Sequence, residues 1–214
     1  MRGLLLLLLA LASQARAQSP VTLMPEGSRE SLVGLAYGEA WKRQGSNERQ
    51  RFLSPFFSIH WSNGAFVEGL SGGWMLSSDP LFQYGPILAL RGRDDGAGGS
   101  QLVPGGFVQW RVLHNVELAA RTGIGSRDGK PQAELAASWF APLSADHTLV
   151  LRAATERAEL WSNRLGARWH WRVGHGYTLV NAVTGIRLAG SSAHAPGVQR
   201  RSSVAWSSAL LVEF

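Results

Sequence analysis

The side chains best placed for chemistry are Ser58, His60 and Glu68, which fall on one predicted strand and on the segment that returns from it. A serine nucleophile needs a base within hydrogen-bond reach and an acidic group that orients this base. Ser58 and His60 share a strand face, but residues two apart on a strand are separated by about 7 Å. This spacing favours an ordinary polar surface, and a lipid-acting hydrolase stays open as an alternative.

A larger set of titratable residues alternates with apolar residues along several short segments. If the apolar faces contact lipid, these charged side chains point into a barrel interior that is narrow enough for them to pair. We therefore expect a lumen charge network, with a small arginine-lined anion pore as the alternative. Its predicted members are Glu117, Glu134, Glu213, Arg111, Arg121, Arg152, Arg168 and Arg172.

Other common chemistries lack their residue patterns in this sequence. His170 and His175 are separated by a predicted turn, and no cysteine completes a metal site around them. The glycine-rich stretch from Gly92 to Gly99 lacks the lysine of a phosphate-binding loop. The sequence therefore predicts no catalytic site, no metal and no cofactor, and the protein is not expected to be an enzyme.

The clearest structural element that positions these charges runs from Leu165 to Val173. Its apolar residues, including Trp169 and Trp171, occupy one face, while Arg168, His170 and Arg172 occupy the other. Only a strand separates them in this way, because a helix would distribute the same residues around its circumference. Ten further segments show similar alternation, among them a glycine-rich strand over residues 65–76 and a strand from Leu149 to Ala153. Asn63-Gly64 is a typical tight-turn sequence before the glycine-rich one.

These strands predict an all-β, antiparallel transmembrane β-barrel. Beyond residue 17 no apolar run approaches the roughly 20 residues of a spanning helix, and a closed barrel is the other fold that satisfies its backbone in lipid. Bacterial barrels have an even number of strands. Eleven candidates therefore become about ten if two glycine-rich ones merge, or twelve if the N-terminal segment hides another.

Both ends of the chain suggest export. Residues 1–17 combine Arg2, an apolar run from Leu4 and the cleavage motif Ala15-Arg16-Ala17, which is typical of a secretory signal peptide. Residues 18–30 are then a periplasmic lead-in and residues 31–214 the barrel. The last strand resembles the closing strand of outer-membrane barrels, whose terminal residues are read by the barrel assembly machinery. The residues expected to form that sorting signal are Trp206, Leu210, Val212 and Phe214.

The composition agrees with a barrel in the outer membrane of a Gram-negative cell. Charged residues make up only 17% of the chain, and there are 25 glycines and 9 tryptophans, which suits strands and interfacial aromatic belts. The formal charge of +6 falls to +4 without Arg2 and Arg16. This modest excess suits contact with anionic lipid or lipopolysaccharide, whereas dispersed basic residues without a recognition motif do not indicate nucleic acid.

Four parts of the sequence share a recognisable pattern: Ser54-Pro55-Phe56-Phe57 with Asn63-Gly64-Ala65-Phe66, Tyr84-Gly85-Pro86 with Gly92-Arg93-Asp94-Asp95, the turn from Leu102 to Gly106, and LAGSSAHAPGVQRR before the last strand. Together these segments resemble the MipA/OmpV family of MltA-interacting outer-membrane proteins. The resemblance implies a scaffold that brings a murein lytic transglycosylase together with a penicillin-binding protein. The sequence thus predicts a structural or scaffolding barrel, with a narrow channel and then a lipid-acting hydrolase as alternatives.

Overall fold

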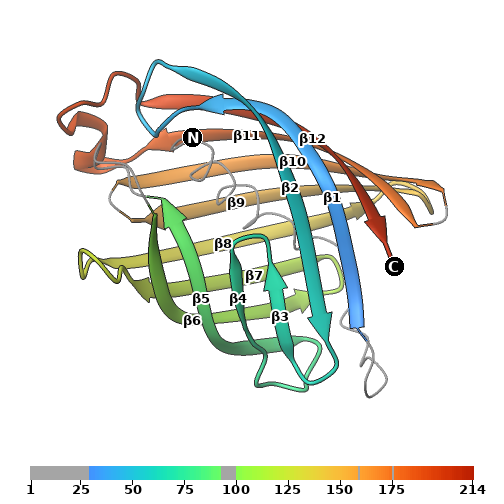
Figure 1. Ribbon diagram of the computed structural model, residues 1–214. Helices are drawn as coiled ribbons and strands as arrows, with labels where there is room; N and C mark the ends of the chain where they lie inside the picture. The colour runs from blue at the N-terminus through green and yellow to red at the C-terminus, as the bar shows by residue number, and fades with distance from the viewer. Residues whose placement is uncertain (1–28, 93–99, 159, 175) are drawn as a thin grey trace.

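The computed structural model describes residues 29–92, 100–158, 160–174 and 176–214, which form one closed antiparallel barrel. Each strand pairs with its neighbours in sequence, and β1 pairs with β12 to close the wall (Figure 1). The predicted all-β barrel is therefore confirmed. The predicted signal peptide lies outside the described residues, as does the lead-in up to residue 28. No helix in the described part is long and apolar enough to cross a membrane.

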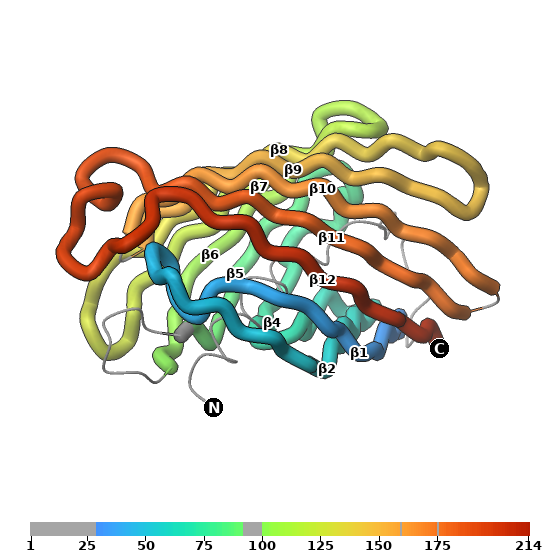
Figure 2. The backbone as a smooth tube through the Cα atoms, turned by 90° about the horizontal axis from the view of Figure 1, so that it is seen from above, coloured from blue at the N-terminus to red at the C-terminus, as the bar shows by residue number. Residues whose placement is uncertain are grey.

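The wall contains twelve strands. They are β1 (Arg29–Trp41), β2 (Arg49–Trp61), β3 (Ala65–Glu68), β4 (Ser71–Trp74), β5 (Phe82–Gly92), β6 (Ser100–Leu113), β7 (Val116–Ile124), β8 (Pro131–Pro142), β9 (His147–Arg157), β10 (Trp161–Gly174), β11 (Tyr177–Leu188) and β12 (Ser202–Glu213). In Figure 1 the strands of the back wall cross β1 and β2 at a steep angle, so the barrel is strongly sheared; Figure 2 shows the same wall from above.

The two ends of the barrel carry different connections. The start of β1 and the C-terminal residue lie at one end, here called the terminal end, where Phe214 N–H donates to the Ser31 carbonyl (3.2 Å). The connections at this end include the short turns 62–64, 114–115 and 143–146. The opposite end, here called the loop end, carries the connection 42–48 and the longest described connection, 189–201, which contains a 3-10 helix, η1 (Gly190–His194).

The strand count is twelve, the alternative number, instead of ten. The extra strand arises because the segment predicted as a single strand, residues 65–76, folds into the β3–β4 hairpin. Gly69 makes this reversal possible, since its φ of 53° lies in the region that side chains with a Cβ rarely adopt. The neighbouring Asn63-Gly64 turn forms as predicted, with Gly64 N–H donating to the Trp61 carbonyl (3.0 Å).

Because the hairpin is short, β2 is paired along its whole length with β1 but along only a short stretch of its other edge with β3. β3 pairs only with Ser58, Ile59 and His60, although β2 has 13 residues. Just beyond this ladder, Pro55 has no N–H to satisfy, and its carbonyl accepts a hydrogen bond from Ser54 Oγ (3.0 Å). Proline is a common means of protecting a strand edge, so this edge is shielded by its own sequence.

The two faces of the wall have opposite polarity. Outward-facing positions carry exposed apolar side chains: Leu165 is 68% exposed and Trp169 39%. Inward-facing positions carry buried polar and charged side chains, among them Glu134 and Arg168, beside a small apolar cluster of Phe66, Ile87 and Phe107. This polarity is the reverse of that of a soluble protein and is the pattern of a barrel surrounded by lipid.

Two loops at the loop end pack together over the β1–β12 closure. Gly45 carbonyl accepts backbone hydrogen bonds from Gln199 (2.7 Å) and Arg200 (3.0 Å). The guanidinium groups of Arg49 and Arg200 lie 4.5 Å and 5.0 Å from the centroid of the Trp41 ring. We call this arrangement of residues 41–49 and 199–200 the loop clasp, and it ties the first strand pair to the last loop.

Candidate functional site

The charged interior is concentrated on β7 to β10, because the period of two in these strands turns every second residue inward. Glu134 of β8 and Arg152 of β9 form a buried ion pair with an N–O distance of 2.5 Å. Arg152 also lies 3.4 Å from Ser138 Oγ, to which it donates a second hydrogen bond. A charge pair with such additional hydrogen bonds meets the requirement for tolerating charge inside a protein.

A second centre surrounds Glu156 of β9, which is only 5% exposed. Its two carboxylate oxygens form ion pairs with Arg91, reaching across from β5, and with Arg164 of β10. Arg121 lies close enough to contribute further electrostatic attraction. Glu134 stands directly opposite Glu156 in the β8–β9 register, so the surrounding arginines offset a repulsion between two carboxylates.

Arg168 of β10 lies beside this network without joining an ion pair among the described residues. It is 8% exposed and stands opposite Val150, one inward position from Arg152 on the neighbouring strand. His170, the next inward residue on β10, is buried as well. Arg152 and Arg168 therefore place two positive charges close together inside the barrel, and no carboxylate of the described residues pairs with Arg168.

The remaining predicted network residues lie nearer the terminal end. Glu117 is buried and accepts a hydrogen bond from Gln109 Nε2 (2.5 Å), and Arg111 stands directly opposite it in the register. Arg172 and Glu213 take inward-facing positions close to that end, but both are exposed and lie outside the buried pairs. The structure thus brings Glu134 and Arg152 together and leaves Arg172 and Glu213 at the rim.

Sequence reasoning missed Glu156 and Arg164, which form a buried ion pair. The predicted strands ended at Ala153 and began again at Leu165, whereas β9 extends to Arg157 and β10 starts at Trp161. The alternation that placed Arg152 inward also places Glu156 inward four residues later. Continuing the alternation of period two from Arg152 to residue 156, and back by one residue from Leu165, would have found both residues.

The possible hydrolase residues meet only in part. His60 Nε2 lies 3.2 Å from Glu68 Oε1, so an acidic group orients the imidazole. Ser58 is buried two residues away, but no hydrogen bond joins its hydroxyl to His60. The His60 ring instead stacks on Phe66 at a centroid distance of 5.8 Å. Within the described residues no group of three His, Asp or Glu side chains could hold a metal ion.

Two carboxylates outside the strands are held by local hydrogen bonds. In the loop clasp, Lys42 Nζ donates to Glu48 (2.8 Å), and this bond with the charge of Lys42 holds the pKa of Glu48 below its ordinary value. In the β7–β8 connection, the Lys130 backbone N–H lowers the pKa of Asp128 in the same way. Both groups are exposed, so they order loops without supporting the barrel.

The predicted sorting residues all face outward on β12 or just beyond it. Trp206, Leu210 and Phe214 are exposed, and Val212 is half-buried. Trp206 packs edge-on against Tyr37 of β1 with ring centroids 5.8 Å apart. The last strand therefore presents an apolar, lipid-facing stripe across the closure of the barrel, and its recognition by assembly machinery stays a prediction.

An apolar outer face, a charged inner face and a closed wall together define a transmembrane β-barrel of the outer-membrane type. No protein-family model and no curated protein sequence matches the chain. Among solved structures, the NanC porin is similar with a TM-score of 0.58 and 11% identity, covering 84% of this chain and 100% of that chain. The translocator domain of autotransporter NalP from Neisseria meningitidis has a TM-score of 0.54 and 14% identity, covering 96% and 93%.

A third similar structure is the KdgM porin in complex with disordered oligogalacturonate. Its TM-score is 0.53 at 9% identity, and the match covers 86% of this chain and 99% of that chain. At such low identities these likenesses show a shared fold. The twelve-stranded barrel is therefore an architecture with solved counterparts, while the charged interior must be interpreted from this chain's own residues.

Proposed function

We propose that this protein is a narrow, anion-preferring channel of the outer membrane. The observation that carries the proposal is Arg168, a buried inward-facing arginine that lies beside Arg152 and forms no ion pair with a described carboxylate. A fixed positive charge in a confined interior attracts anions and repels cations. The buried state of the neighbouring charged side chains implies a small cross-section and hence a low conductance.

The expected electrostatic effect is sizeable. At roughly 8 Å and an effective dielectric constant of about 20, one unit charge changes the energy of a passing ion by about 2 kcal/mol. Dissolved salt screens part of this interaction. Removing the charge of Arg168 should therefore change the anion-to-cation permeability ratio several-fold.

The comparisons support a channel without naming its solute. Two of the similar structures are porins, and the KdgM porin was solved with an oligogalacturonate. Sugar units of that kind carry carboxylates, which is the charge type that Arg168 would attract. The longer connections at the loop end suit the external side of an outer-membrane barrel, where they would contact lipopolysaccharide.

Planar-bilayer recording in a salt gradient tests the proposal. The wild-type barrel should show small discrete conductance steps and a reversal potential that indicates anion preference. Arg168→Gln should shift that potential toward cation preference, whereas Arg168→Lys should retain it. Arg51→Gln is the matched control, because Arg51 is exposed on the outer face of β2 and its loss removes the same charge. A folded wild-type barrel that gives no steps would refute the channel, and equal shifts in Arg168→Gln and Arg51→Gln would refute the role of Arg168 in its anion preference.

Membership of the MipA/OmpV family and the murein scaffold role stay predictions. Such a scaffold would act through turns at the terminal end, and its partners would be the transglycosylase and penicillin-binding protein that the resemblance implies. Co-purification of either enzyme with the membrane-extracted barrel is the relevant measurement. A barrel without conductance that retains these enzymes would favour the scaffold over the channel.

A further inference from the structure

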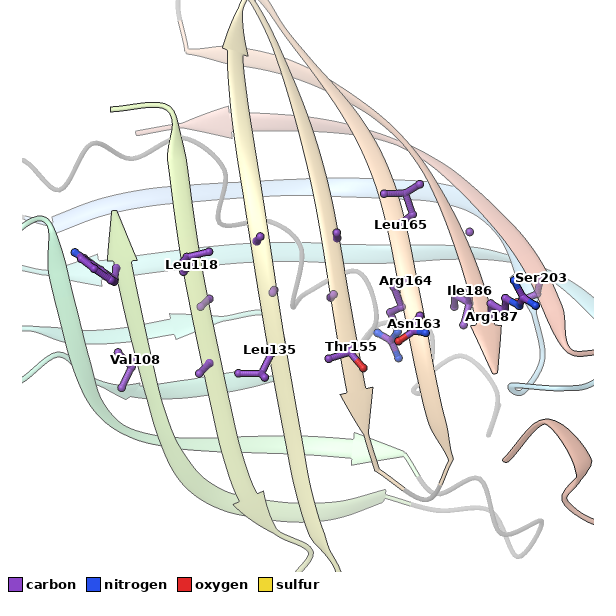
Figure 3. Close-up of a pocket in the computed structure, with 18 of the residues that line it drawn as sticks. Val108, Leu118, Leu135, Thr155, Asn163, Arg164, Leu165, Ile186, Arg187 and Ser203 are labelled. Carbon is purple, nitrogen blue, oxygen red and sulfur yellow. The ribbon is translucent and has the colours of Figure 1, made fainter. Parts of the chain in front are cut away.

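A shallow groove of about 920 Å³ crosses the outer face of the barrel from β5 to β12 (Figure 3). Its floor follows from the strand register, which sets Ala137 opposite Ala153 and places Leu165 between Ala153 and Gly185. Small outward-facing side chains let the surface recede between larger neighbours. We call this groove, with its floor of Ala137, Ala153 and Gly185, the outer trough; its size is within the range typical of ligand sites.

The outer trough has a polar end. Thr155, Asn163 and Arg187 follow one another in a single cross-strand row along its lining. Arg187 is the second-last residue of β11, so this row lies at the loop end of the wall. Arg157, two residues beyond Thr155 on β9, is exposed at the same end. Among the described residues neither arginine forms an ion pair.

The lipid that surrounds the outer trough limits which molecules can bind in it selectively. Lipid tails are as apolar as the alanine floor, so covering the floor with a hydrocarbon chain contributes little affinity by itself. The polar end can add affinity, because arginines near a membrane surface attract anionic headgroups and pair well with phosphate. Trp161, 49% exposed beside Arg157, marks the headgroup level at which interfacial tryptophans sit.

We propose that the outer trough binds lipid A, with a phosphate against Arg187 and Arg157 and one acyl chain along the floor. The loop end carries the longest described connection, 189–201; long connections face outward in such barrels, and the outer leaflet on that side is built from lipid A. The inference rests on the outer-membrane location proposed above, but it does not depend on conduction. A phospholipid of the opposite leaflet would meet the terminal end of the wall, away from these arginines.

Native mass spectrometry of the detergent-purified barrel, titrated with lipid A, measures this binding directly. Arg187→Gln should lower the affinity for lipid A about fivefold, which is the usual contribution of one basic residue to binding at an anionic lipid surface. Ala153→Leu should weaken it as well, because the larger side chain fills the floor. The matched controls are Arg51→Gln, on the outer face of β2, and Ala167→Leu, an exposed outward position that does not line the trough. A heat-dependent gel shift establishes that each variant is folded.

The outcomes separate the alternatives. Weaker binding in both trough variants, with both controls near wild type, supports the site. Equal effects of Arg187→Gln and Arg51→Gln would place the headgroup elsewhere, and equal effects of Ala153→Leu and Ala167→Leu would leave the floor unoccupied; either result overturns the proposal. Phosphatidylglycerol or dephosphorylated lipid A binding as tightly as lipid A would also overturn it. A barrel that conducts but does not retain lipid A loses only this inference.

Discussion

Replacing Glu156 with glutamine should destabilise the barrel more than any other conservative change in the interior. Glu156 is buried and neutralises both Arg91 and Arg164, so the variant leaves two guanidinium groups without a carboxylate. Breaking a buried ion pair costs about 3–5 kcal/mol. Because the Arg91 side chain keeps 21% exposure and can recover some hydration, we expect the lower end, about 3 kcal/mol. That is roughly a hundredfold change in the unfolding equilibrium constant.

Urea titration of the barrel in lipid vesicles, followed by tryptophan fluorescence and the heat-dependent gel shift, measures this loss. The double variant Glu156→Gln/Arg91→Gln should lose less than the two single variants together, since Arg91 has already lost its partner in the first. Glu48→Gln, which removes an exposed loop carboxylate, is the control with the same chemical change. If Glu156→Gln and Glu48→Gln unfold at the same urea concentration, the buried pairs do not stabilise the wall and the reasoning fails.

Two further predictions concern the loop clasp. Trp41→Ala should lower the free energy of unfolding by about 3 kcal/mol, because it removes a buried ring and two cation–π contacts. Limited proteolysis should then cut residues 189–201 faster, while Trp41→Phe should retain most of the protection. Unchanged cleavage in Trp41→Ala would contradict the role of Trp41 in the loop clasp. The pKa of the Glu48 carboxyl should lie below its ordinary value of about 4.5, so the Lys42–Glu48 pair supports the loop above that pH and is lost as the pH falls through the lowered pKa. The chemical shift of this carboxyl, followed against pH in wild type and Lys42→Gln, measures the effect. Equal titration midpoints in the two proteins would exclude the pair.

Most of the architecture could be predicted because a period of two is a strong signal. The alternation along β10 set the lipid-facing tryptophans apart from Arg168 and His170, and the structure places them on opposite faces of the wall. The same rule placed the apolar residues of β12 outward. Such predictions need no knowledge of partner strands, because side-chain direction is a local property of an extended backbone.

The features that could not be predicted depend on pairing. Nothing in the sequence around Gly69 distinguishes a hairpin from a continuous glycine-rich strand, since the reversal lacks an Asn-Gly or Asp-Gly pair. The link from Arg91 to Glu156 joins residues far apart in the chain across the interior, and only the closed barrel brings them together. The outer trough likewise exists only once the register aligns alanines from different strands.

The short β3–β4 hairpin also determines how evenly the barrel resists deformation. A closed wall behaves like a hoop, and its stiffness at each seam depends on the number of ladder hydrogen bonds that cross it. β1 and β2 pair along 13 residues, whereas β2 and β3 share three paired positions and β4 and β5 another three. Thermal breathing should concentrate where few bonds must open. The wall should therefore open most easily on either side of the β3–β4 hairpin, and amide hydrogen exchange there should be the fastest in the wall.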